Sequence, residues 1–339
     1  MKFGIIKERK NPPDKRAVLS PMACLRLKEM YPQAIIQVEN CNYRAFTDDE
    51  YKAVGVEVVN DVSDCDVLLG VKEVPVEALI PNKKYFFFSH TIKKQPHNRK
   101  LLRAVLDKNI QLFDHEVITN NKGERLVAFG RYAGIVGAYN GFRALGLKSG
   151  LFHLPKAETL QNQQQLIEQL QHVKNQLPPI KVLLTGKGRV GSGAKEMLEG
   201  MGLKKVGVKE YLTKTFNLPV YCQIDVLDYN KRKDGHRMGK DDFYKNPQEY
   251  ESDFLRFATV TDLYLAGHYY GSGAPAFFTA EDVKSENFKI KVIADISCDV
   301  GGPIPTTLRA STIAEPLYGY HRQTGEETHY QNQEAVAVM

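Results

Sequence analysis

The stretch Val182-Leu183-Leu184-Thr185-Gly186-Lys187-Gly188-Arg189-Val190-Gly191-Ser192-Gly193 decides the fold class of this chain. Its apolar start predicts a strand, and the glycine-rich loop that follows opens a predicted helix from Ala194 onwards. A strand, a Gly-x-Gly-x-x-Gly loop and a helix, in that order, form the dinucleotide-binding fingerprint. The helix N-terminus attracts the negative charge of a pyrophosphate.

Each glycine of the loop has a physical reason in this fingerprint. Gly186 allows a tight turn, Gly188 lets the backbone approach the pyrophosphate, and Gly191 lets the helix pack closely on the strand. A glycine-rich turn without a ligand is the alternative interpretation, but the flanking strand and helix favour nucleotide binding. We therefore expect these three glycines, with Arg189 and Val190, to bind a cofactor.

The composition describes an ordinary soluble globular protein with small-molecule partners. The chain has 339 residues, 42% of them hydrophobic and 25% charged, which predicts two domains that each bury a core. The net charge of +6 is mild, and no basic stripe is interleaved with aromatic residues, so nucleic acid is not an expected partner. Small anions such as dinucleotides and carboxylates suit this charge equally well.

The cysteines and the chain start predict the compartment. The five cysteines are scattered and form no Cys-x-x-Cys pair, which argues against a metal site and fits a reducing cytoplasm. The first residues are too few and too polar for a signal peptide. No apolar run approaches the length that spans a membrane. We expect a cytoplasmic protein with no metal and no membrane partner.

Strands alternate with helices along the first part of the chain, which predicts parallel crossovers. A small, glycine-containing apolar segment at 132–147 predicts a tightly packed helix that bridges two domains. The sequence therefore predicts an α/β protein of two Rossmann-like domains with parallel sheets and a cleft between them. The expected domains are a substrate-binding one at 1–130 and a dinucleotide-binding one at 131–339. The expected strands of the first domain lie at 3–6, 34–38, 56–59, 67–71, 85–88 and 110–113.

The second half carries further strands and two polar segments. Residues 159–176 have apolar positions at helical spacing, which predicts an amphipathic surface helix. Residues 230–245 are polar and basic and predict a solvated excursion. Residues 334–339 read as the beginning of a strand, so we expect a natural chain that continues further. The expected strands lie at 182–185, 220–224, 261–267 and 291–296.

Polar residues follow the predicted strands of the first domain, and parallel sheets bind ligands at the carboxyl ends of their strands. Each such residue alone is more often an ordinary surface or hydrogen-bonded group than a functional one. Several at the same edge of one sheet favour a site. The residues concerned are Arg16, Lys72-Glu73, His90, Glu116 and Arg125.

Arg16, Lys72, Glu73 and His90 lie in stretches that resemble the NAD-dependent, lysine-forming saccharopine dehydrogenases, within the wider alanine dehydrogenase and transhydrogenase superfamily. The matching stretches run from the N-terminus to about residue 310 and are together more specific than the glycine loop. They are Lys7-Glu8, Asp14 to Pro21, Gly70 to Pro75, Phe88-Ser89-His90, Phe129 to Gly134, the glycine loop, and Asp295 to Asp299.

The resemblance implies residue roles. It implies that Lys72 and His90 are the acid–base groups. It implies that Glu73 and Glu116 are acidic residues that tune this basic pair. It also implies that Arg16 and, less securely, Arg125 bind substrate carboxylates. The physical chemistry agrees, because saccharopine is lysine joined to glutarate through a secondary amine and presents multiple carboxylates.

The chemistry of such a substrate requires repeated proton transfer. Removal of a hydride leaves an imine, water must add to it, and the carbinolamine must collapse to lysine and 2-oxoglutarate. Histidine titrates near neutrality, whereas a lysine base needs its pKa lowered by burial or by neighbouring positive charge. The nicotinamide supplies the hydride chemistry and the protein orients it.

Other residues are expected along the cofactor. Gly267 and His268 end a predicted strand, and Asp295 ends the next one, near the nicotinamide; a hydrogen-bonded histidine at a strand end is the alternative for His268. The acidic residue about 20 residues after the glycines normally binds the ribose. Glu210 has that spacing in a poor strand, whereas Asp225 ends a better one and favours NAD.

The cofactor and substrate leave alternatives open. Lys231, Arg232 and Lys233 follow Asp225 and could accept the 2′-phosphate of NADP, so NADP is not excluded. Three functions stand: a dehydrogenase of saccharopine or a similar opine-type amino acid, an alanine dehydrogenase, and a non-catalytic, regulatory NAD-binding protein. Arg16 and Arg125, with the Asn11-Pro12-Pro13 loop, favour the larger, multi-carboxylate substrate.

Overall fold

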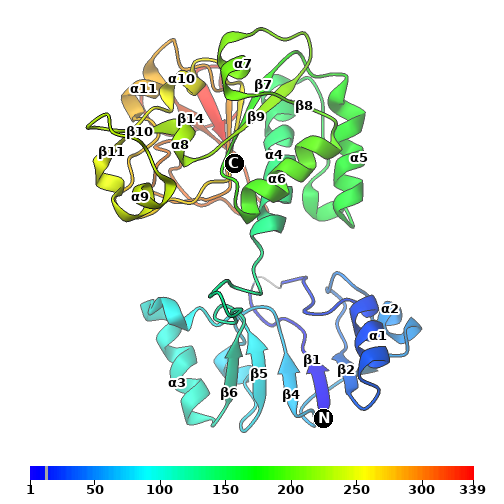
Figure 1. Ribbon diagram of the computed structural model, residues 1–339. Helices are drawn as coiled ribbons and strands as arrows, with labels where there is room; N and C mark the ends of the chain where they lie inside the picture. Colours follow the sequence, from blue (N-terminus) through cyan, green and yellow to red (C-terminus); the bar gives the residue numbers. More distant parts are fainter. Residues whose placement is uncertain (12–13) are drawn as a thin grey trace. The chain divides into compact units, whose positions relative to one another are not determined.

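The computed structural model describes residues 1–11 and 14–339, which form two compact units, Met1–Ala128 and Phe129–Met339. Each unit is described by itself below (Figure 1). Pro12 and Pro13, in the loop expected to favour a large substrate, lie outside the described residues.

The first unit is built on a parallel sheet. Its six strands lie in the order β3-β2-β1-β4-β5-β6, and every neighbouring pair is parallel. This confirms the predicted α/β organisation, with each strand within one or two residues of its expected range. The strands are β1 (Lys2–Ile5), β2 (Ile35–Glu39), β3 (Glu57–Val59), β4 (Val67–Leu69), β5 (Lys84–Phe87) and β6 (Gln111–Asp114).

Local signals start the helices of this unit. Ser20 caps the first helix by accepting a hydrogen bond from the Ala23 N–H, and Pro21 occupies the first helical position. Thr47 and Glu50 form a reciprocal capping box on the second helix. The helices are α1 (Pro21–Met30), α2 (Asp48–Ala53) and α3 (Arg99–Asp107), and short 3₁₀ turns cover Val76–Ala78, Thr91–Lys93 and Pro96–Asn98.

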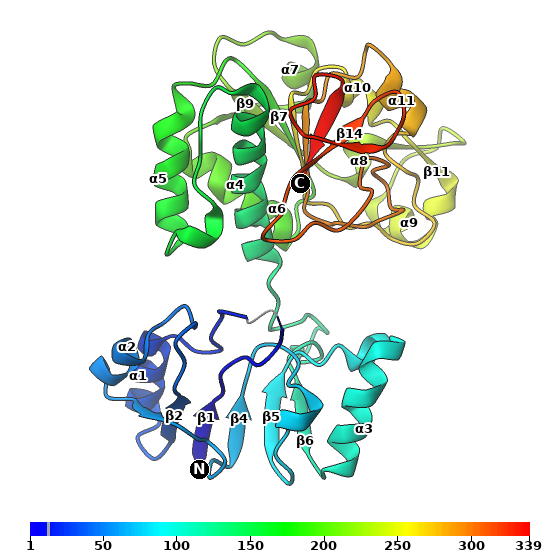
Figure 2. The same ribbon diagram turned by 180° about the vertical axis from the view of Figure 1, so that it is seen from behind.

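Alternate residues of the strands feed two separate cores on the two faces of this sheet. Ile5 of β1 packs with residues of α1 and α2, whereas Leu68 of β4 packs with residues of α3. In Figures 1 and 2, α1 and α2 lie near β2, and α3 lies near β6 at the other end of the sheet. This arrangement leaves the carboxyl edge of the strands to the loops that carry the expected site residues.

The second unit contains an eight-stranded sheet in the order β15-β14-β16-β13-β12-β7-β9-β8. The prediction of a purely parallel sheet is wrong here, because β14 runs antiparallel to both β15 and β16. The segment at 334–339 contains a strand as expected, and its residues Ala335–Val338 are buried beside β13. The strands are β7 (Lys181–Thr185), β8 (Lys204–Lys205), β9 (Val220–Ile224), β12 (Leu263–Ala266), β13 (Val292–Asp295), β14 (Tyr318–His321), β15 (Glu327–Thr328) and β16 (Ala335–Val338).

Helices cover both faces of this sheet. Val182 and Leu184 of β7 pack with α4, α5 and α6, while Leu183 packs into the core on the other face. The glutamine-rich segment forms α5, as its spacing predicts. The helices are α4 (Gly130–Ser149), α5 (Gln163–Lys174), α6 (Arg189–Gly200), α7 (Val208–Thr213), α8 (Val226–Tyr229), α9 (Lys240–Lys245), α10 (Leu255–Ala258) and α11 (Ala280–Lys284), with 3₁₀ turns at Ala157–Thr159 and Pro247–Glu249.

Helix α4 is the predicted glycine-containing helix, but it lies wholly within the second unit and does not bridge the two. It packs directly against α6, the helix that follows the glycine loop (Figures 1 and 2). A Cβ atom at Gly134 would meet the Val190 carbonyl oxygen at 2.0 Å, and one at Gly193 would meet the Arg131 carbonyl oxygen at 1.9 Å. The glycines are therefore required by the close approach of the two helices.

The polar segment at 230–245 is only partly the solvated excursion that its composition predicts. Residues Asn230–Arg232 (β10) pair antiparallel with Tyr250–Ser252 (β11), and α9 follows the hairpin's first strand. Phe243 of α9 is buried and packs against the aromatic ring of Tyr250. The short strand pairing and the buried Phe243 therefore order part of a segment whose polar composition predicts a solvated loop.

Candidate functional site

The carboxyl edge of the first unit's sheet brings one expected acid–base residue, His90, together with Glu73, one of the acidic residues expected to tune it. His90 follows β5, and its Nδ1 hydrogen-bonds Glu73, which follows β4. The second oxygen of Glu73 accepts from the Lys10 Nζ at 3.3 Å. Burial raises the pKa of Glu73, but its hydrogen bonds, including that with His90, outweigh this and hold the pKa below its usual value. Glu73 is therefore an anion that orients the His90 ring.

His90 itself has an unusual backbone. Its φ of 55° places it in the left-handed region, which non-glycine residues adopt rarely and which surrounding contacts must hold. Its carbonyl oxygen accepts from the Asn98 Nδ2 at 3.2 Å, and its ring lies 6.2 Å from that of Phe88. These contacts hold the imidazole at the edge of the sheet, half-buried.

Lys72 directly precedes Glu73 and is also half-buried. Burial is the main cause that lowers the pKa of its ammonium, and the nearby positive charges of Arg16 and Lys10 lower it further. A lysine with a lowered pKa exchanges protons more readily near neutrality than a solvated one. This is the environment that an acid–base lysine requires.

Glu116 and the two expected arginines complete this edge. Glu116 is half-buried and pairs with Arg125 at 3.8 Å and with Lys93 at 3.6 Å. The Arg125 guanidinium also lies over the Phe88 ring, 6.0 Å from its centroid. Arg16 binds Asp14 through both carboxylate oxygens, and its side chain is 43% exposed. Both arginines thus present partly exposed guanidinium groups, the form that binds carboxylates bidentately.

The glycine loop lines a cavity of about 350 Å³ in the second unit. The loop joins β7 to α6, and a Cβ at Gly188 would meet no atom within 4 Å, which leaves its backbone open to a ligand. Gly186 has φ +90°, and a Cβ at Gly191 would meet the Gly186 carbonyl oxygen at 2.1 Å. The cavity is lined by Gly186, Lys187, Gly188, Arg189, Val190, Asp225, Val226, Tyr229, Lys240, Tyr244, Gly267, His268 and Tyr269.

Asp225 lies at the carboxyl end of β9 and lines this cavity. Its carboxylate caps α8 through the Val226 N–H at 2.9 Å and pairs with the Lys240 Nζ at 2.8 Å. Burial raises the pKa of Asp225, but the hydrogen bonds from Lys240 and the Val226 N–H, together with the positive charges of Lys240 and Lys187, outweigh this effect and lower it. Glu210, the other acidic candidate, sits in α7 and pairs with Lys214.

The basic run after Asp225 is engaged elsewhere. Lys231 pairs with Glu251 at 3.1 Å, and the Lys233 Nζ donates to the Gln248 carbonyl oxygen at 2.8 Å. Arg232 binds Asp234 and Asp242. None of the three basic residues is among the residues given above as lining the cavity. The three basic residues that could have accepted the 2′-phosphate of NADP therefore do not line this cavity.

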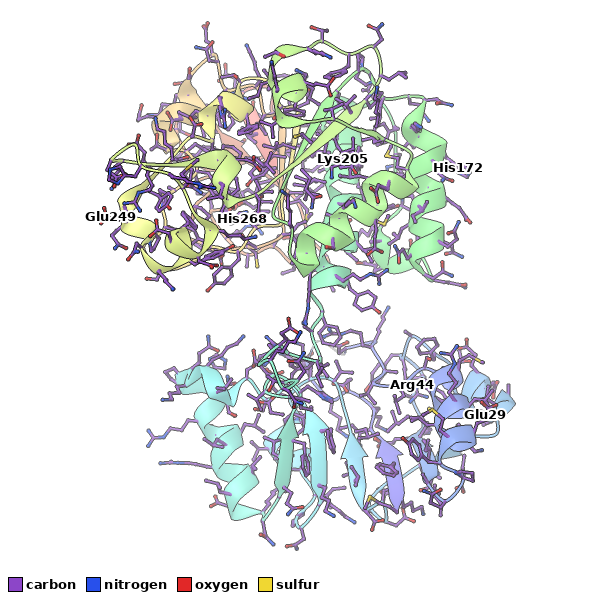
Figure 3. The ribbon with its side chains drawn as sticks, in the orientation of Figure 1. Glu29, Arg44, His172, Lys205, Glu249 and His268 are labelled. Atoms are coloured by element: carbon purple, nitrogen blue, oxygen red, sulfur yellow. The ribbon has the colours of Figure 1, made fainter. Side chains whose placement is uncertain are left out.

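His268 lies two residues after the end of β12, and Asp295 is the last residue of β13. His268 lines the cavity and is 6% exposed; its Nδ1 hydrogen-bonds the Thr185 Oγ1 at 3.1 Å (labelled in Figure 3). Its Nε2 has no hydrogen-bond partner among the described residues. The Asp295 carboxylate accepts from the Ser297 and Thr307 hydroxyls, both at 2.6 Å, and does not line the cavity. Asp295 thus shapes the loop that follows its strand.

Burial of His268 predicts a pH-dependent stability. Burial lowers the pKa of its imidazole to about 4, from a usual value near 6.5. Between these values the unfolded chain binds more protons than the folded one, so stability falls as the pH drops from about 6.5 to about 4. We expect His268→Gln to lose less of its melting temperature than wild type over this window, measured by calorimetry. Equal losses in the two proteins would contradict the assignment.

Sequence reasoning missed several residues of both sites. Glu8, Lys10 and Asp114 lie at the same carboxyl edge as His90, and the strand-end rule would have found Glu8 and Asp114. Lys240 and Tyr244 line the cavity from α9, in a segment expected to be solvated. No sequence signal pointed to those two, because their place depends on how the segment folds back.

Two negative findings apply to residues 1–11 and 14–339. No helix there is long and apolar enough to cross a membrane. No group of three or more histidine, cysteine, aspartate or glutamate residues there could hold a metal ion.

The chain is similar to known proteins over nearly all of its length. The family model for the alanine dehydrogenase/PNT N-terminal domain matches residues 4–136. An α-aminoadipic semialdehyde synthase of Arabidopsis thaliana is 28% identical over 99% of this chain and 35% of its own length. A saccharopine dehydrogenase (NAD⁺, L-lysine-forming) of Emericella nidulans is 25% identical over 90% of this chain and 77% of its own length.

The fold has solved counterparts as well. An L-alanine dehydrogenase structure superposes with a TM-score of 0.61 at 19% identity, covering 94% of this chain and 80% of that one. A transhydrogenase from Sinorhizobium meliloti superposes with a TM-score of 0.54 at 16% identity, covering 90% of this chain and 80% of that one. The chain spans just over a third of the synthases that it matches, 35% for the Arabidopsis protein and 38% for the mouse one.

Proposed function

We propose that this chain, which is similar to saccharopine dehydrogenases and matches the alanine dehydrogenase/PNT N-terminal family model over residues 4–136, is an NAD-dependent oxidoreductase that interconverts saccharopine with L-lysine and 2-oxoglutarate. The first unit is then the substrate-binding part, and the second unit binds the dinucleotide. The observation that carries the proposal is the half-buried Lys72, with its lowered pKa, next to the Glu73–His90 pair at one sheet edge.

The chain's own residues supply the proton chemistry of this reaction. In the lysine-forming direction, the substrate's secondary amine becomes an imine, water adds, and the carbinolamine collapses. His90, oriented by Glu73, is proposed to take a proton from the attacking water. Lys72 is proposed to exchange protons with the substrate nitrogen, which it can do because burial and Arg16 destabilise its ammonium form. His90 thus acts on the attacking water, and Lys72 acts on the substrate nitrogen.

The carboxylates of the substrate need positive charge. Arg16 and Arg125 are the proposed partners, because both present a partly exposed guanidinium at the same edge as Lys72. Each is paired with one carboxylate, Asp14 and Glu116 respectively, which orients the guanidinium before substrate arrives. A small substrate such as pyruvate presents one carboxylate and has less use for both arginines.

The second unit fits NAD by three features of its cavity. The open backbone at Gly188 leaves room for a pyrophosphate at the N-terminus of α6. Asp225 at the end of β9 stands where an acidic side chain binds the adenosine ribose. The unpartnered His268 Nε2 offers one more polar contact. When bound, the nicotinamide accepts or gives the hydride.

One assay separates this proposal from its alternatives. We expect NADH oxidation with L-lysine plus 2-oxoglutarate, and little with pyruvate plus ammonia, followed as loss of absorbance with NADPH run in parallel. Turnover only with pyruvate and ammonia would make the chain an alanine dehydrogenase. Calorimetric binding of NADH without turnover on either substrate pair would leave a non-catalytic, regulatory NAD-binding protein.

A further inference from the structure

A buried carboxylate that has no role in the proposed chemistry accepts a hydrogen bond from the backbone of Lys72. Glu8 follows β1, is 5% exposed, and accepts hydrogen bonds from the backbone N–H groups of Val71 at 2.7 Å and Lys72 at 2.9 Å. Both donors follow β4, the strand beside β1. One side chain therefore ties together the two loops that leave neighbouring strands, and one of those loops carries Lys72.

A second buried carboxylate does the same for His90. Asp114 is the last residue of β6 and is 8% exposed. It accepts from the Ser89 hydroxyl, from the Ser89 N–H at 3.4 Å and from the Glu116 N–H at 2.8 Å. Ser89 is fully buried and immediately precedes His90. Asp114 thus holds the segment that leads into His90 and the one that carries Glu116.

The left-handed backbone of His90 makes this anchoring necessary. A non-glycine residue in that region is strained and persists only where surrounding contacts determine it. Ser89 contributes a second bond, since its hydroxyl lies 2.8 Å from the Thr91 hydroxyl. The network on Asp114 therefore fixes the residues on both sides of His90.

We propose that Glu8 and Asp114 are positioning residues, which set the places of Lys72 and of His90 with Glu116 through hydrogen bonds from the backbone N–H groups of the segments that carry them. The proposal rests on the proposed function, in which Lys72 and His90 move the protons. Neither carboxylate is assigned contact with substrate or cofactor; each acts through the segment that it holds. Bonds from backbone N–H groups to a charged acceptor are stronger than neutral ones, which suits them to this task.

The substitution Glu8→Gln tests the first half. A carboxamide keeps the volume but offers one acceptor oxygen, so one of the two N–H groups loses its partner and faces another donor. Misplacement of a catalytic group by about 1 Å costs about 10²-fold in rate. We expect kcat with lysine, 2-oxoglutarate and NADH to fall by about that factor, with KM and the NADH dissociation constant nearly unchanged. Hydrogen exchange should quicken at the amides of Val71 and Lys72.

Asp66 provides the matched control, because it links the same two strands at their opposite ends. Its carboxylate precedes β4 and accepts from the Lys2 N–H, at the start of β1, at 2.7 Å. Asp66→Asn therefore weakens one carboxylate–backbone bond between β1 and β4 away from Lys72. We expect its kcat to equal that of wild type. Asp114→Asn tests the second half independently, with faster exchange expected at Ser89 and Glu116.

The outcomes decide between positioning and a merely structural role. Wild-type kcat in both Glu8→Gln and Asp114→Asn would overturn the proposal, and so would faster exchange spread evenly over the first unit. If the wild-type protein turns over neither substrate pair, the proposed function fails. Local exchange changes confined to residues 71–72 and to Ser89 and Glu116 would then still support the anchoring, and their absence would refute it.

Discussion

Replacement of Lys72 by methionine is expected to lower kcat with lysine, 2-oxoglutarate and NADH by about 10²–10⁴-fold, the usual value of a positioned general acid or base. Methionine has a similar length but cannot exchange a proton. The ammonium that it removes has a pKa lowered first by burial and then by Arg16. Because Lys72 lies in the first unit and the glycine loop in the second, NADH affinity should stay nearly unchanged.

Steady-state kinetics and calorimetric titration with NADH measure the two quantities separately. Lys52→Met is a suitable control, since Lys52 is an exposed lysine of α2 whose ammonium pairs with Asp49 of the same helix. It should leave kcat as in wild type. A large loss of NADH affinity in Lys72→Met would refute the acid–base role given to this residue, and so would an unchanged kcat.

Replacement of Gly193 by alanine is expected to destabilise the second unit by at least the 1–3 kcal/mol that is typical of overpacking, about 2–4 °C in melting temperature for each kcal/mol. The new Cβ would meet the Arg131 carbonyl oxygen at 1.9 Å, and that oxygen belongs to the backbone of α4. Backbone atoms cannot turn away as a flexible side chain can. The two helices must therefore separate.

Gly188→Ala separates stability from cofactor binding within the same loop. Its Cβ would meet no atom within 4 Å, so the melting temperature should match that of wild type. The methyl group would stand where the backbone is expected to approach a pyrophosphate, so NADH affinity should fall sharply. Thermal unfolding and NADH titration of both variants provide the test. Stability lost in Gly188→Ala but not in Gly193→Ala would contradict the packing described for this loop.

Much of the fold was predictable from local patterns. The strands of the first unit follow from short apolar runs, and α1 follows from Ser20 and Pro21, whose hydrogen bond and ring act on their immediate neighbours. The glycine loop was equally readable, because its spacing encodes a turn, an open backbone and a close contact. In each case the information lies within a few residues of the element that it specifies.

Other features depend on partners distant in sequence. The antiparallel β14 is fixed by pairing with β16, which a single segment does not reveal. Glycine disfavours a helix by local propensity, yet Gly134 lies in α4 because α6 lies against it. Helix α9 lines the cofactor cavity only because its segment folds back, so Lys240 was read as solvated.

The candidate site also combines residues that local sequence predicts with contacts that depend on distant partners. Residue types and strand ends pointed to Lys72, Glu73, His90 and Glu116, and the structure places the Glu73–His90 contact among them. It could not be foreseen that Glu8 would hold the backbone of Lys72, because that bond spans 64 positions of the chain. The strand-end rule can point to Glu8 and Asp114 as residues of this edge, but it cannot show which backbone segments their carboxylates hold.

The contact between α4 and α6 also limits how this protein could be redesigned. Because α6 touches α4 backbone to backbone, Gly191 and Gly193 cannot accept a side chain without a shift of the surrounding backbone, which limits how residues 189–193 can be changed. Substitutions are better accommodated at another part of the cavity lining, where Asp225 at the end of β9 pairs with Lys240 at the start of α9. Directed evolution for another dinucleotide should accumulate its changes there and leave the glycines untouched.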